Sequence, residues 1–181
     1  MPAAETAPQP AVTAARLLPS IRITHGLFHN LLDGLTPERF ARQPEGVNTN
    51  HPAFILGHLS LYPPRLLEAL GVESPERPNP EHASLFEAGA ECRDDPAGNL
   101  YPPMDQIVAD FDRVMTSAAE RIATVPEERF ASALPPDHGF ARLMPDLGAL
   151  ASFVLVAHPM LHAGQLSAWR RCEGLGACKL M

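Results

Sequence analysis

The chain has 181 residues, which is enough for one domain with a sizeable hydrophobic core. Its formal net charge is −7 and its 14 basic residues do not cluster, so we expect neither nucleic acid nor an anionic membrane as a partner. The stretch 1–13 is rich in proline and alanine and lacks the basic region of a secretory signal. We interpret it as a disordered N-terminal tip before a single domain at 14–181. No later segment approaches about 18 uninterrupted apolar residues, so a soluble, cytoplasmic protein is expected.

Three cysteines, Cys92, Cys172 and Cys178, are odd in number and form no CxxC motif. This pattern argues against a disulfide framework and against a cysteine-based zinc site. We expect reduced thiols, with Cys172 packed in the core.

Apolar residues recur at helical spacing in four places, and no segment shows the alternation of a strand, so the fold is predicted to be all-α. The first helix is expected at about 18–35, with regular helix beginning near Pro19. Its apolar stripe includes His25.

The second helix is expected to begin at Asn50 or His51 and to stop at Gly71. Pro63 and Pro64 fall inside it. Because proline lacks a backbone donor and clashes with the preceding turn, this helix should kink or briefly open just after His58.

The third helix is predicted at 104–125, between Pro102-Pro103 and Pro126, and the fourth at about 146–172 with Gly174 as its stop. The connection 72–102 is longer than most links between bundle helices. Such crossovers often cover a functional mouth.

Three histidines are candidate metal ligands. His158 and His162 are four residues apart on the fourth helix, which puts both imidazoles on one face. Two imidazoles need a third ligand to complete a catalytic-type metal site, and His58, on the inward side of the second helix, is the natural candidate. The spacing alone is equally compatible with two core or surface histidines that hold no ion.

The sequence NHPAFILGHLSLY resembles the second-helix signature of the DinB/YfiT-like superfamily, and HPMLHAGQLSAWRR resembles its fourth-helix signature. The stretch LLDGLTPERFARQPEGVNTNHP is similar to the family's passage from the first helix to the second. The resemblance implies an up-down-down-up four-helix bundle with a metal, commonly zinc or nickel, on His58, His158 and His162. It also implies a possible homodimer. Characterised relatives include S-transferases and isomerases that use low-molecular-weight thiols, while many members have no known activity.

The chain departs from the family pattern at Pro159, directly after a predicted ligand. This proline leaves the carbonyl of Leu155 without its helical partner, so we predict a kink or a π-like widening beside the metal. The resemblance also implies that the amide of Gln165 could orient a metal-binding side chain by a hydrogen bond, without binding the metal itself.

Other residues are weaker candidates. His25 and Tyr62 could act catalytically, as could the loop residue His138, although a single core histidine is more often a hydrogen-bonded packing residue. His25 and His29 form another HxxxH pair that nothing else in the first helix supports. His51 lies seven residues before His58, about 10 Å along the helix axis, which is too far to share one ion.

These features favour a metal-dependent enzyme that activates a thiol cosubstrate toward a small-molecule electrophile, an S-transferase by resemblance. A metal-dependent hydrolase is the alternative by chemistry. A non-catalytic metal- or ligand-binding stress protein and a structural dimer with empty histidines also stay open. The sequence identifies neither the ion, nor the substrate, nor a general base.

Overall fold

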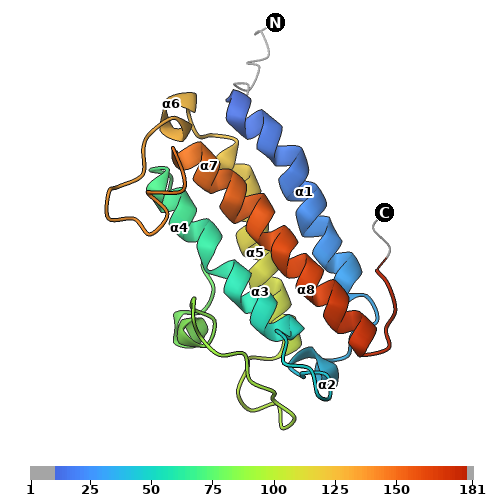
Figure 1. Ribbon diagram of the computed structural model, residues 1–181. Coiled ribbons are helices and arrows are strands. Elements are labelled where there is room, and N and C mark those ends of the chain that lie inside the picture. Colours follow the sequence, from blue (N-terminus) through green and yellow to red (C-terminus); the bar gives the residue numbers. More distant parts are fainter. Residues whose placement is uncertain (1–10, 179–181) are drawn as a thin grey trace, which may run out of the picture.

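The computed structural model describes residues 11–178, and within that range it contains helices and no strand, which confirms the all-α prediction. Four long helical runs lie side by side in the described part of the chain (Figure 1). They are α1 (Val12–Leu32), α3 with α4 (Pro52–Ser60 and Tyr62–Ala69), α5 (Met104–Ile122), and the continuous run α7, η2 and α8 (Leu147–Ser152, Phe153–Ala157 and His158–Cys172). Short helices occupy the connections: α2 (Pro37–Phe40), the 3₁₀ helix η1 (Pro80–Leu85) and α6 (Glu127–Phe130).

The runs are held together by apolar side chains that each of them buries. α5 packs against α3 and α4, α1 packs against α8 and α5, and α3 also contacts α8. Burying one large apolar side chain contributes about 1.5–3 kcal/mol, and the core includes Phe28, Ile55, Phe111, Leu155 and Trp169, all nearly inaccessible. The packing therefore fixes α3 and α8 face to face.

The first helix begins six residues before the predicted start, at Val12 rather than 18, and Pro19 lies inside it. Pro19 leaves the Ala15 carbonyl without its helical donor, but the first turn has independent support, because the backbone N–H and hydroxyl of Thr13 donate to the Glu127 carboxylate at 3.0 and 2.6 Å. The helix thus takes in the end of the predicted tip 1–13. Residues 1–10 of that tip lie outside the described residues.

The second helix opens where its prolines predict. α3 ends at Ser60 and α4 begins at Tyr62, two to four residues after His58. Gly71 follows the end of α4 with φ +75°, a left-handed conformation that favours glycine. The Arg129 side chain donates to the carbonyls of Leu70 and Ala69 at 3.0 and 2.9 Å, which satisfies acceptors left open by the helix end.

The other two runs start close to their predicted positions. α5 begins at Met104 but ends at Ile122, three residues early. α7 begins after Asp146, whose carboxylate accepts the Ala149 N–H at 2.8 Å.

The core position predicted for Cys172 is wrong, because this residue is exposed on the last turn of α8. Trp169 and Arg170 occupy the buried positions of that turn.

The run Leu147–Cys172 is long and apolar enough, by length and composition, to cross a membrane, with a mean hydropathy of 1.4 over its most apolar window. The sequence-based expectation considered only unbroken apolar stretches, and here Ser152 and His158 interrupt the run. Within the fold, 44% of the window is buried. Leu150, Ala151 and Leu155 are core residues, so the high hydropathy has a structural explanation in helix packing.

His51 caps the start of α3 and is completely buried. Its Nδ1 accepts the Phe54 N–H at 3.2 Å and its Nε2 donates to the Arg93 carbonyl at 3.0 Å. Burial lowers the pKa of His51 from 6.5 to about 4. Between these values the unfolded chain binds the proton more readily, so this residue's contribution to stability is present above pH 6.5 and is lost as the pH falls toward 4.

We therefore expect the free energy of unfolding of His51→Asn to depend less on pH than that of the wild type. Asparagine keeps an acceptor for the Phe54 N–H and does not titrate, so the slope between pH 6.5 and 4 should fall by up to about 1.4 kcal/mol per pH unit. Urea unfolding of metal-free protein at pH 7.5, 6 and 5 measures this. Parallel pH profiles for the two proteins would contradict the buried neutral state of His51.

Candidate metal centre

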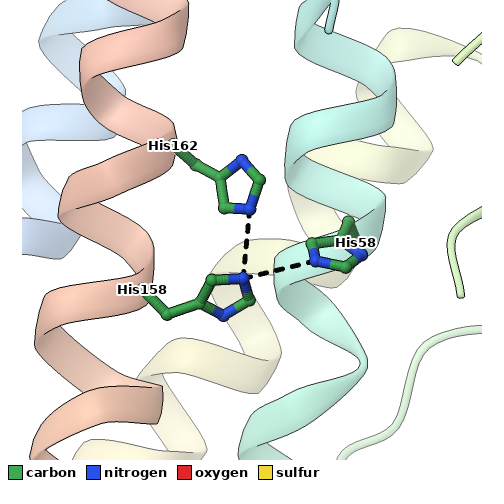
Figure 2. Close-up of side chains that lie close together, drawn as sticks. All are labelled: His58, His158 and His162. Carbon is green, nitrogen blue, oxygen red and sulfur yellow. Dashed lines mark hydrogen bonds between the residues drawn. The ribbon is translucent and has the colours of Figure 1, made fainter. Parts of the chain in front are cut away.

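Three imidazoles from two helices converge between α3 and α8. His58 comes from the last turn of α3, and His158 and His162 come from the first two turns of α8 (Figure 2). The Nε2 atom of His158 lies 3.3 Å from that of His58 and 3.1 Å from that of His162. Each ring offers one ligand atom, and these atoms all lie within 4.8 Å of one another.

Hydrogen bonds at the opposite ring nitrogens orient two of these histidines. His58 Nδ1 donates to the carbonyl of Phe86 at 2.7 Å, and His162 Nδ1 donates to Oε1 of Gln165 at 2.8 Å. In a neutral ring a proton on Nδ1 leaves a lone pair on Nε2. Both lone pairs therefore point toward the centre of the cluster, as in metal sites where a partner behind the ring fixes its tautomer.

The third ring, His158, is held by packing. Its ring stacks on Phe153 with centroids 5.5 Å apart and meets the edge of Tyr62 at 5.0 Å. Its Nδ1 is buried without a hydrogen-bond partner in the described part of the chain. A proton on His158 Nε2 could be donated to Nε2 of His58 or to Nε2 of His162, but not to both at once. A cation shared by the three Nε2 atoms would satisfy all of them, so the residues fit a metal ion.

The electrostatic environment keeps these rings neutral at physiological pH. Burial lowers the pKa of His58 and of His162. For His158, burial and then the neighbouring charges of His162 and His58 lower the pKa to about 4. Neutral imidazole is the form that binds metal ions, so little free energy is spent on removing protons from this cluster.

The predicted widening of the fourth helix is confirmed. The π-helical segment η2 ends directly before His158, whose backbone N–H bonds to the carbonyl of Phe153 five residues earlier. Pro159 has no N–H for the carbonyl of Leu155 and its ring would crowd that carbonyl in a regular helix. The extra residue in this turn sets the direction from which His158 enters the cluster.

Two residues that shape the surroundings of His58 are not apparent from the spacing of the histidines, namely Phe86 and Gly57. Phe86 lies in the 72–102 crossover, directly after η1, and packs against α3 at Gly57. A Cβ atom at Gly57 would lie only 2.5 Å from the Phe86 ring, so this close approach requires glycine. A glycine inside an apolar helix, next to His58, was the available sequence signal.

The remaining candidates fall in different places. Tyr62 contacts the cluster, with its ring 4.9 Å from that of His58, and burial raises the pKa of its phenol. Gln165 also accepts from Asn50 Nδ2 at 3.3 Å, which ties the start of α3 to α8. The His138 ring lies 6.0 Å from that of Phe140, which in turn contacts Phe153.

His25 belongs to a separate cluster. Its Nε2 lies 2.8 Å from the Asp112 carboxylate, and its ring centroid lies 5.1 Å from that of His29. The structure therefore places His25 with α1 and α5 partners and not among the three converging rings.

These features define an all-helical protein with a buried candidate tri-histidine metal centre. A family model described as the DinB superfamily matches residues 20–166, which include all three histidines. The chain belongs to this superfamily. No curated protein and no solved structure matches it significantly.

We expect His58→Ala, His158→Ala and His162→Ala each to lose one tightly bound equivalent of divalent metal per chain, because two imidazoles retain little of the affinity of three. Elemental analysis after purification without an affinity metal column, followed by zinc titration, measures this. His82→Ala, in η1, serves as the histidine control and should keep the full metal content. Undiminished metal in any of the three ligand variants would exclude that residue from the centre.

Pro159→Ala should restore a backbone donor for Leu155, allow a regular helical turn and raise the Tm of the metal-free protein. The same change should redirect His158 and lower zinc affinity about tenfold or more, as changes behind a ligand typically do. Calorimetric melting and competitive zinc titration separate the two effects. A higher Tm with unchanged zinc affinity would show that η2 does not aim His158.

Proposed function

We propose that this protein is a metal-dependent enzyme that activates a low-molecular-weight thiol for transfer to an electrophilic small molecule, an S-transferase type of reaction. The ion, zinc or nickel, would be held by His58, His158 and His162. One observation carries the proposal: three neutral imidazoles present Nε2 to a common point, and two of them are fixed there by hydrogen bonds at Nδ1.

The donor set suits an anionic partner. A divalent ion on three imidazoles keeps an open position and lowers the pKa of a thiol bound there. The candidate group contains only histidines, so no carboxylate of the cluster compensates the charge of a cation. His158 is partly exposed, whereas His58 and His162 are buried.

The surrounding side chains have distinct roles in this proposal. The Phe86 carbonyl and Gln165 hold His58 and His162 in the binding tautomer. Tyr62 lies against the rings of His58 and His158, and its hydroxyl can donate a hydrogen bond to an incoming anion.

The wider architecture supports the same proposal. We infer an up-down-down-up bundle: in Figure 1, α1 and α7–α8 descend toward the end that carries α2, whereas α3–α4 and α5 ascend. The crossover 72–102 joins the two ascending runs. We place the protein in the cytoplasm.

A homodimer is supported by exposed apolar side chains on the neighbouring helices α1 and α8, namely Ile23, Met160 and Leu161.

A thiol titration of cobalt-substituted protein tests the proposed chemistry. Co²⁺ reports sulfur ligation through a charge-transfer absorption band, and a thiol that ionises on binding releases a proton. We expect glutathione or a related cellular thiol to produce both signals in the wild type. The His158→Ala protein should give neither.

Tyr62→Phe is a second variant for this titration. It keeps the aromatic contacts and removes the hydroxyl, so the band should persist while the apparent thiol affinity falls several-fold. Cobalt-loaded wild type that shows no sulfur band with any common cellular thiol would overturn the thiol proposal while leaving the metal centre intact.

A further inference from the structure

A second cluster of potential ligands lies outside the centre described above, between α1 and α5. His25 and His29 are one turn apart on α1, and Asp112 faces them from α5. The Nε2 atoms of the two histidines lie 2.8 and 3.1 Å from the same oxygen, Oδ1 of Asp112. The two imidazole rings are 5.1 Å apart and tilted by 47°, so both converge on that oxygen.

The separations between these atoms suit a shared ion. Ligand atoms bound at about 2.0–2.2 Å in a tetrahedral or octahedral arrangement lie about 3 Å from one another, close to the two observed distances. The side chains of His25, Asp112 and His29 are 20%, 33% and 52% exposed, so solvent can fill the remaining coordination positions.

Among the described residues, no guanidinium forms an ion pair with the Asp112 carboxylate. Arg113, the next residue along α5, is engaged by Glu76 and Asp110 in ion pairs of its own. Within residues 11–178, the charged contacts of Asp112 are with the two imidazoles. A carboxylate that faces two such rings presents one negative charge and two nitrogen donors to a cation.

We propose that His25, His29 and Asp112 form a second binding site for a divalent first-row transition-metal ion, separate from the tri-histidine centre, which joins α1 to α5. Two imidazoles and one carboxylate suit ions such as Zn²⁺, whereas Mg²⁺ and Ca²⁺ prefer oxygen-only sites. Because the ligands come from two helices, an ion bound only by the folded state stabilises that state by mass action. The site is on a face of the molecule that the proposed thiol chemistry does not use.

Zinc titration in the presence of a competing chromophoric chelator tests the proposal. The wild type should bind two equivalents per chain, and His158→Ala, in which the tri-histidine centre is disabled, should still bind one. Adding Asp112→Asn to His158→Ala should lower the affinity of that remaining equivalent at least tenfold. The increase in Tm that zinc gives the His158→Ala protein should disappear with it, and Mg²⁺ should produce no increase in either protein.

Glu120→Gln is the matched control, since it removes an exposed carboxylate from the same helix and should leave the second equivalent unchanged. His29→Ala is an independent variant at a half-exposed position and should behave like Asp112→Asn. If zinc binding and the zinc-dependent Tm shift of His158→Ala survive both Asp112→Asn and His29→Ala, or if His158→Ala binds no zinc at all, the second site is overturned. Neither result bears on the tri-histidine centre, which the wild-type count and the ligand variants test separately.

Discussion

The hydrogen bond from His58 to the carbonyl of Phe86 connects the candidate centre to the rest of the fold. It joins the 72–102 crossover to α3 at 2.7 Å and fixes which nitrogen of His58 faces α8. The Phe86 ring reaches this position because Gly57 has no side chain to obstruct it. A crossover that would otherwise be only a connection thereby becomes part of the site.

A second constraint comes from the backbone of the last helical run. Pro159 cannot donate to Leu155, and the chain responds with the π-helical segment η2 immediately before His158. A helical irregularity of this kind has lost regular hydrogen bonds, yet here it contains the core residue Leu155 and lies close to the core residues Ala151 and Ala163 in the chain. The surrounding packing therefore retains a local distortion directly beside the candidate ligand His158, and π-bulges are frequent at functional sites.

The two histidine clusters in the described part of the chain differ in burial and in charge. His58 and His162 are less than 10% exposed and are oriented by hydrogen bonds, so they are preorganised for one geometry. The His25 cluster is more exposed and contains a carboxylate, which reduces the net charge of a bound ion and leaves room for water. The first arrangement suits chemistry at an open coordination position. The second suits a cross-link between helices.

The sequence by itself determined the helical class, most helix positions and the break near Pro63, because apolar periodicity and proline act through local geometry. It also identified His58, His158 and His162 as a group and predicted the widening beside Pro159. Spacing could not show whether His158 and His162 face His58, because that depends on how α3 and α8 pack. The same limit hid the roles of Phe86 and Asp112, which lie 28 residues from His58 and 87 residues from His25 along the chain. Only the tertiary structure decided these contacts, since they are made between segments whose relative position no local pattern encodes.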